Sequence, residues 1–176
     1  QDETGFTGNY ESRGLNEEYL KNVIDFMQRA IRHRLYLIPI LDEFPKNAYY
    51  SSIEKIVDAN QNADKRIVGY NRQYLSPGRI EAKAKAAADF VRYIAESHPN
   101  LLNGVLGWSL ANEIHVVHDS GPFNRNKGTI RTANGKSYDM GDKNSRQNCY
   151  DENILFWANR LADAIREVDP NALVTA

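Results

Sequence analysis

The chain alternates amphipathic helices with short apolar runs, and this alternation constrains its fold more than any other feature. A first helix is predicted after Asn16, a good N-cap, with apolar residues recurring every three or four positions up to Ile31. Further helices are expected at residues 77–97 and from Asp151 or Asn153 to 168. Three apolar runs are typical of buried strands: residues 35–41, 105–111 and 172–175. This order predicts an α/β fold, a parallel sheet with helical crossovers.

Some segments depart from the alternation of helices and strands, and the alternation itself leaves two architectures open. Residues 119–150 are rich in Gly, Asn, Lys and Arg and predict one long loop, which in a compact domain is usually functional or disordered. Residues 51–59 could form a short helix, and Pro39 would cost its strand one ladder hydrogen bond. The three strands fit either a doubly wound sheet or part of an eight-stranded barrel, which needs about 250 residues.

The composition excludes several classes of function. The chain has 22 Lys and Arg against 23 Asp and Glu, a formal charge of −1, so we expect no nucleic-acid partner and no anionic membrane partner. No apolar run approaches the roughly 20 residues that span a bilayer. Cys149 is the one cysteine and is interpreted as incidental. No phosphate-binding Gly-rich motif follows a strand, and no cofactor is expected.

Acidic residues follow two of the predicted strands. Asp42 and Glu43 come directly after the first apolar run, and Asn112 and Glu113 come directly after the second. In both α/β architectures, functional residues gather at the carboxyl ends of the strands. A carboxylate next to a buried run needs either a partner or a water-filled site. Glu113 is therefore either a paired strand-end residue or part of an active site.

The segment Gly107-Trp108-Ser109-Leu110-Ala111-Asn112-Glu113 resembles the fourth-strand signature of the clan A glycoside hydrolases. These are (β/α)₈ retaining enzymes that include the family 5 cellulases and mannanases. The resemblance implies that residues 1–176 form a partial TIM-barrel catalytic domain, from about helix 2 to strand 5. Residues 119–150 would then be the loop after strand 4. The strand-like run at the end of the sequence leads us to expect that the rest of the barrel lies in a missing part of the chain.

The resemblance also implies roles for individual residues. Glu113 would be the general acid/base, a role that needs a raised pKa, and Asn112 would hydrogen-bond the sugar 2-hydroxyl. The nucleophile would be a Glu at the end of a seventh strand, outside this sequence. Asp42 and Glu43 are candidates for substrate contact or for bracing a loop, and His115 is a candidate substrate contact. Trp108 would lie either in the core or in the cleft.

Other side chains near these positions have weaker claims. His115, His118 and Asp119 are close in sequence, but no third ligand has convincing spacing, so no metal site is expected. Four tyrosines could stack on sugars: Tyr49, Tyr50, Tyr70 and Tyr74.

The sequence thus predicts a retaining β-glycoside hydrolase, a glycosidase with a carbohydrate substrate, of which this segment alone is incomplete. Secretion is expected from the resemblance alone. Two alternatives remain open: a non-catalytic carbohydrate-binding barrel derived from such an enzyme, and a small doubly wound domain unrelated to sugars. As a partial barrel the isolated chain would expose strand edges and apolar flanks, so we expect it to aggregate or dimerise.

Overall fold

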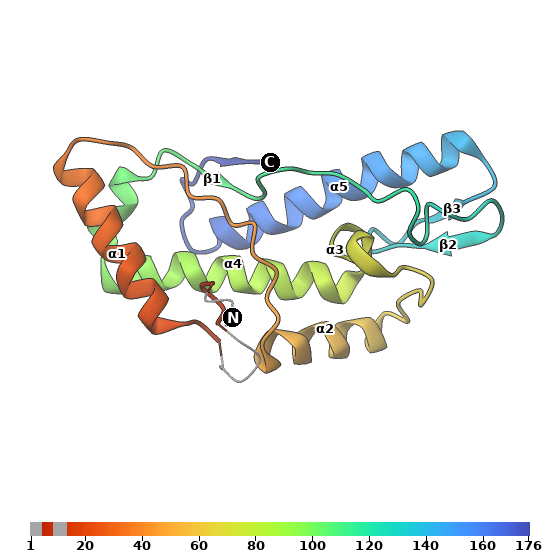
Figure 1. The fold of residues 1–176 in the computed structure, drawn as a ribbon, viewed down its shortest axis with the longest axis horizontal. Coiled ribbons are helices and arrows are strands. Elements are labelled where there is room, and N and C mark those ends of the chain that lie inside the picture. The colour runs from red at the N-terminus through yellow and green to blue at the C-terminus, as the bar shows by residue number, and fades with distance from the viewer. Residues whose placement is uncertain (1–4, 9–13) are drawn as a thin grey trace. The chain divides into compact units, whose positions relative to one another are not determined.

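A computed structural model describes residues 5–8 and 14–176 of the chain and contains both helices and strands (Figure 1). The helices are α1 (Glu17–Arg32), α2 (Ala48–Asn60), α3 (Arg72–Leu75), α4 (Pro77–Ser97) and α5 (Lys143–Arg166). Two 3₁₀ helices are η1 (Gly69–Asn71) and η2 (Pro99–Gly104). The strands are β1 (Trp108–Ser109), β2 (Thr129–Arg131), β3 (Ser137–Asp139) and β4 (Val174–Thr175).

Contacts divide the chain into two compact units. The first unit consists of Gln1–Ser52, Lys83–Glu113 and Leu161–Ala176. The second unit consists of Ile53–Ala82 and Ile114–Arg160.

Helix α1 of the first unit begins and ends as its sequence predicts. The Asn16 side chain accepts a hydrogen bond from the Tyr19 backbone N at 3.1 Å, which satisfies one of the free N–H groups at the helix start. Acidic residues occupy the first turn and basic residues the last turn, where each sign of charge suits the helix dipole. One face of the helix is buried: Leu20, Ile24, Met27 and Ala30.

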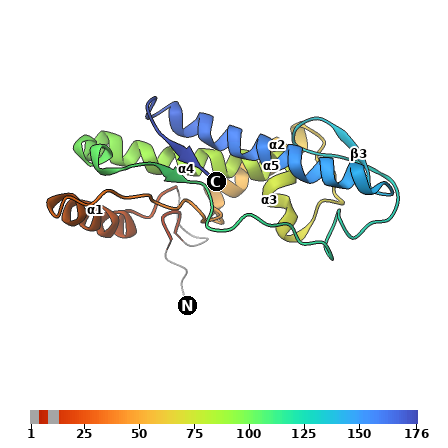
Figure 2. The same ribbon diagram turned by 90° about the horizontal axis from the view of Figure 1, so that it is seen from above.

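Three extended segments of the first unit are parallel neighbours, in the order in which they occur along the chain. β1 pairs with β4, with Trp108 opposite Val174, and the two strands lie side by side in Figures 1 and 2. Isolated parallel bridges join the segment 35–41 to the β1 segment: Leu37 with Val105 and Ile40 with Ser109. The α/β expectation, parallel pairing with helices between the strands, agrees with this arrangement.

The segment 35–41 is a less regular strand than its sequence predicts. Its pairing is confined to two bridges, and the register shifts by one residue between them. Pro39 lies in this interval; it has no N–H to donate, although its carbonyl accepts from the Ser109 N at 2.9 Å. The ladder of backbone hydrogen bonds between the two segments is therefore interrupted at Pro39, which has no N–H to donate.

The expectation that residues 35–41 are buried on both faces is wrong. Tyr36, Ile38 and Ile40 are all more than half exposed, whereas Leu41 is buried. Alternate side chains of an extended segment point to opposite faces, so one face packs into the core and the other faces outward. Leu173, which directly precedes β4 and lies beside Gly107, is also exposed. We call Tyr36, Ile38, Ile40 and Leu173 the open apolar face.

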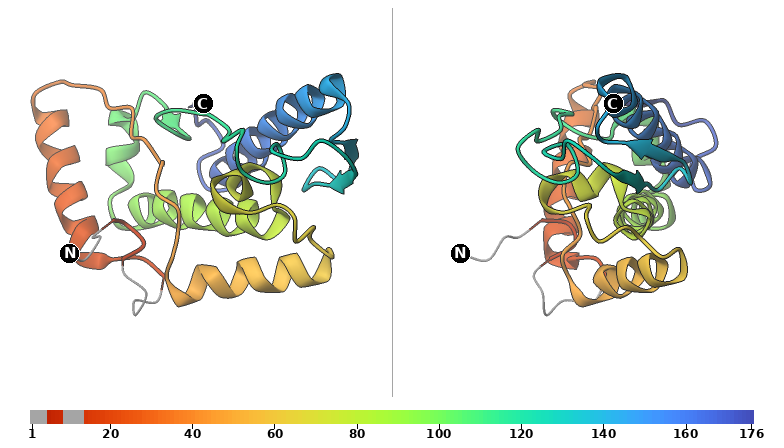
Figure 3. Two further views of the ribbon diagram at one scale, coloured as in Figure 1. Left: turned by 45° about the vertical axis from the view of Figure 1, so that its right-hand side comes forward. Right: turned by 90° about the vertical axis from the view of Figure 1, so that its right-hand side faces the viewer.

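The second unit corrects the expectation of one long loop at 119–150. Within this range β2 and β3 form an antiparallel hairpin, with Ile130 opposite Tyr138 (Figure 3). Gly135 in the connecting turn has φ +79°, a left-handed conformation that favours glycine. An Asn-Gly pair between two runs of residues that favour strands is a known signal for a hairpin turn. Asn134-Gly135 is such a pair, so the position of this turn could have been predicted from the sequence.

Helix α5 also begins earlier than expected, at Lys143 rather than at Asp151 or Asn153. The carboxylate of Asp142 accepts a hydrogen bond from the Ser145 N at 2.6 Å and so caps the first turn. The residues that follow are mostly polar, and their weak apolar period hid the helix. Only after Cys149 do apolar residues recur at helical spacing.

Candidate functional site

Four of the predicted site residues lie in the first unit, where they follow the carboxyl ends of two neighbouring parallel segments. Asp42 follows the segment that pairs through Ile40, and Asn112 and Glu113 follow β1. The side chains of Asp42, Asn112 and Glu113 are exposed. The Ser109 hydroxyl donates to the Ala111 carbonyl at 2.9 Å and fixes the turn through which β1 leads into Asn112. These polar groups can therefore meet a ligand from solvent.

Glu43 differs from the other three because its carboxylate is already bound. It accepts hydrogen bonds from the Thr7 backbone N, at 3.2 Å, and from the Thr7 hydroxyl. Asn47 holds the same N-terminal segment, because its amide donates to the carbonyls of Thr7, at 2.6 Å, and Gly14, at 2.7 Å. Of the two roles expected for Glu43, this geometry favours bracing of a loop over contact with substrate.

Asn47 is a structural residue that the sequence analysis did not single out. Its side chain is fully buried, and besides its two amide bonds its Oδ1 accepts from the Tyr50 N at 3.1 Å at the start of α2. An Asn just before a helix is a recognisable N-cap. The two bonds to the N-terminal segment span more than 30 residues of sequence, so no local pattern could have indicated them.

Trp108 belongs to the core of the first unit. The side chain has no exposed surface and meets the Phe90 ring edge-on, with centroids 6.1 Å apart at 89°. Its indole Nε1 has no hydrogen-bond partner among the described residues. Of the two places expected for Trp108, the structure selects the core, and the ring offers no face to a sugar.

Two of the four candidate tyrosines keep exposed rings. Tyr49 in the first unit is 40% exposed and Tyr70 in the second is 41% exposed, whereas Tyr50 and Tyr74 are buried. The Tyr50 hydroxyl donates to Asp89 at 3.1 Å. Burial, together with the neighbouring Asp89 carboxylate, raises the pKa of Tyr50 above its usual value.

His115 and His118 lie in the second unit and are both exposed. The His115 ring stacks on Tyr70, with centroids 4.5 Å apart and planes 18° from parallel. The His118 ring meets Phe123 at 6.2 Å. Among the described residues no three His, Cys, Asp or Glu side chains form a group that could hold a metal ion.

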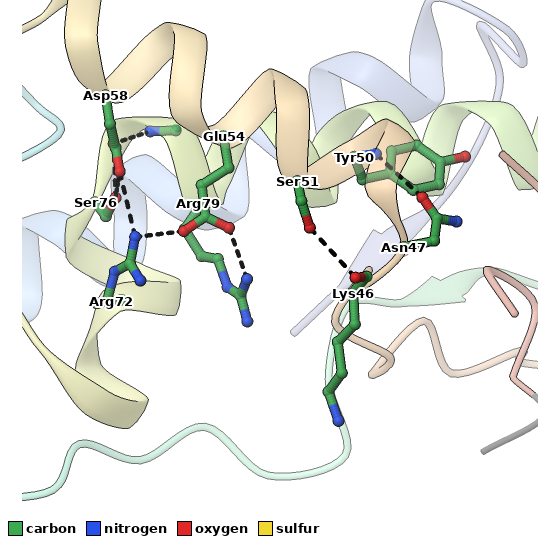
Figure 4. A network of polar contacts seen from close by, with 10 residues as sticks. Lys46, Asn47, Tyr50, Ser51, Glu54, Asp58, Arg72, Ser76 and Arg79 are labelled. Atoms are coloured by element: carbon green, nitrogen blue, oxygen red, sulfur yellow. Dashed lines mark hydrogen bonds and ion pairs between the residues drawn. The ribbon is translucent and has the colours of Figure 1, made fainter. Parts of the chain in front are cut away.

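The most connected ionic group of the second unit surrounds Glu54 and Asp58 on α2 (Figure 4). Glu54 accepts from Arg79 at 2.7 Å and from Arg72, and Arg72 also approaches Asp58 at 3.4 Å. Asp58 accepts from the Ser76 hydroxyl at 2.8 Å and, at the same distance, from the backbone N of Gly78. The network joins α2 to the start of α4 and is structural, because its charges neutralise one another.

Cys149 is a buried thiol on α5. Burial raises its pKa from 9.0 to about 12, and the nearby Glu152 carboxylate adds to the effect. A thiol of this kind is a poor nucleophile near neutral pH. The interpretation of Cys149 as incidental to any chemistry agrees with this environment.

Comparison with known proteins identifies no relative of the chain: no family model, no curated protein and no solved structure matches it. In the described part of the chain, every helix is too short or too polar to cross a membrane.

Proposed function

We propose that the chain is part of a retaining β-glycoside hydrolase in which Glu113 is the general acid/base. The observation that carries the proposal is the position of Asn112-Glu113. The pair is exposed at the carboxyl end of β1, and the neighbouring parallel segment also ends in an acidic residue, Asp42. In α/β folds this edge of the sheet is where ligands bind.

The open apolar face of the first unit supports the barrel part of the proposal. Trp108 and Leu41 are buried, whereas Ile38 and Ile40 each remain 52% exposed and Leu173 remains 65% exposed. The interior of an eight-stranded barrel is filled by bulky branched side chains from all of its strands. A sheet segment that contributes Ile and Leu to such an interior exposes them until the remaining strands are present.

In the proposed reaction, Glu113 and Asn112 have the roles that the resemblance of residues 107–113 implies. Glu113 donates a proton to the glycosidic oxygen as the leaving group departs, and afterwards takes a proton from the water that releases the sugar. The Asn112 amide donates to the sugar 2-hydroxyl. The nucleophile is a carboxylate on a later strand, about 5 Å from the acid/base. Asp42 contacts sugar hydroxyls, and Glu43 keeps the N-terminal segment in place through Thr7.

The test compares Glu113→Gln with Asp42→Asn in a polypeptide that carries the whole barrel. Both changes replace an exposed strand-end carboxylate by its amide, so they are matched in size and charge. General acid/base catalysis contributes about 10²- to 10⁴-fold. We expect hydrolysis of β-glucan or β-mannan oligosaccharides to fall by at least about 100-fold in Glu113→Gln. Asp42→Asn should lower kcat only a few-fold.

A second readout separates loss of acid/base chemistry from loss of folding. In Glu113→Ala with an activated aryl glycoside, added azide can attack the glycosyl-enzyme without needing a base. Azide should therefore restore turnover and yield a β-glycosyl azide. Unchanged turnover in Glu113→Gln would refute the role of Glu113. Oligosaccharide binding without hydrolysis in the unmodified protein would show a carbohydrate-binding barrel instead of an enzyme.

A further inference from the structure

A cavity in the second unit has the character of a binding site for anions. It measures about 430 Å³, within the range of roughly 300–1,000 Å³ typical of small-molecule sites. Four basic side chains line it: His115, His118, Lys143 and Arg146. None of the described residues that line it is acidic.

The two permanent cations of this cavity lie on one face of one helix. Lys143 and Arg146 are three residues apart on α5, a spacing that places them side by side, where like charges repel. Lys143 is exposed and makes no ion pair with any described residue. Arg146 donates one N–H to the Met140 carbonyl, which orients its guanidinium and leaves other donors free. An anion bound between them would offset the repulsion.

Two nearby carboxylates, Asp142 just before α5 and Asp151 on it, form no ion pair with either cation in the described part of the chain. The Asp142 carboxylate accepts from the Ser145 N at 2.6 Å, as the cap of the helix. The Asp151 carboxylate accepts from the Gln147 amide at 2.9 Å. Both cations therefore keep N–H donors that a ligand can reach.

Apart from Gln147, which is polar, the rest of the lining is apolar or aromatic. Phe123 is buried and Tyr150 is half-buried, and Ile114 and Val116 complete this part of the surface. The His115 ring is held in place by its stacking on Tyr70. A ligand with an apolar or ring-shaped body can pack against this side while its charged group meets the cations.

We propose that this cavity binds a small organic anion, a carboxylate or a phosphate carried on an apolar or ring-shaped body. The site lies in the second unit and does not depend on the glycosidase proposed for the first. The charge-assisted hydrogen bonds of Lys143 and Arg146 hold the anion, and Phe123 and Tyr150 contact its body.

The four histidines of the chain provide the test, because each gives its own imidazole NMR signals. His115 and His118 line the cavity, whereas His33 and His98 belong to the first unit and serve as internal controls. Benzoate and phenyl phosphate are titrated at low ionic strength into the unmodified chain, with benzyl alcohol as the neutral probe. We expect an anion to shift the His115 and His118 signals only, and added salt to weaken its binding.

The two anionic probes distinguish the sources of the charge. A shift with benzoate alone identifies a carboxylate site, and a shift with phenyl phosphate alone identifies a phosphate site. Benzyl alcohol binding as tightly as either anion would overturn the proposal. Equal shifts at all four histidines, or no shift at any, would also overturn it.

Lys143→Gln supplies the variant and Lys55→Gln its matched control. Both remove one exposed positive charge from a helix of the second unit, and Lys55 does not line the cavity. Loss of one charge-assisted hydrogen bond should weaken anion binding by about tenfold in Lys143→Gln. Lys55→Gln should change it by less than about twofold, as expected for an exposed, screened charge outside the lining of the cavity. Equal effects of the two changes would refute the assignment.

Discussion

Replacing Glu54 by Gln removes the negative charge that two arginines of the second unit share. The Glu54 side chain is only 9% exposed and accepts hydrogen bonds from both Arg72 and Arg79 (Figure 4). Gln keeps the volume and one acceptor oxygen but carries no charge. The variant therefore removes the charge and one of the two hydrogen bonds that Glu54 accepts from the arginines, and it leaves the packing in place.

The size of the effect follows from the exposure of the three side chains. Removing one partner of a fully buried ion pair costs about 3–5 kcal/mol, whereas an exposed pair is worth less than about 1 kcal/mol. Arg72 is 40% exposed and Arg79 is 24% exposed, so water still solvates both cations once Glu54 is neutral. We therefore expect the free energy of unfolding to fall by about 2 kcal/mol, or the Tm by about 4–8 °C.

The assay is urea denaturation followed by circular dichroism, with Asp25→Asn as the control. Asp25 pairs with Arg29 on α1, and the two side chains are 55% and 67% exposed, so this change should cost less than about 0.5 kcal/mol. A lower urea midpoint with an unchanged slope would confirm loss of native-state stability. If Glu54→Gln costs no more than Asp25→Asn, the ionic network does not hold α2 to the start of α4.

Three further changes test other features. Gly78→Ala should destabilise the chain by about 1–3 kcal/mol, because the added Cβ would overlap the Glu54 carbonyl oxygen; a higher urea midpoint would contradict this. The folded Cys149 thiol, with a pKa near 12 against an ordinary 9.0, keeps its proton where the unfolded thiol loses it. Stability should therefore fall by roughly 1 kcal/mol from pH 8 to pH 10, and by less in Cys149→Ala; equal losses in urea titrations would exclude this cause. Ile40→Lys on the open apolar face should reduce self-association measured by light scattering, whereas Ile56→Lys, at a somewhat more exposed position on α2, should not; equal effects would show that this face does not drive association.

Local sequence patterns located the helices whose apolar period is strong. Asn16 marks the start of α1, and Ser76-Pro77 marks the start of α4. Signals of this kind act over a few residues, because caps and turn geometries depend on neighbours in the chain. The same rule would have found the Asn134-Gly135 turn, whereas the start of α5 lacks a clear apolar period and depends on its Asp142 cap.

The sequence by itself determined that Asp42 and Glu113 follow apolar runs, because that is a property of neighbouring residues. Only the tertiary structure decided what each strand-end group contacts. Glu43 is held by Thr7, 36 residues away, and Trp108 is buried against Phe90. Contacts of this kind join segments that are distant in sequence, and no periodicity encodes which segments meet. Burial of one face of residues 35–41 likewise depends on which helices cover it, and that is fixed when the chain packs.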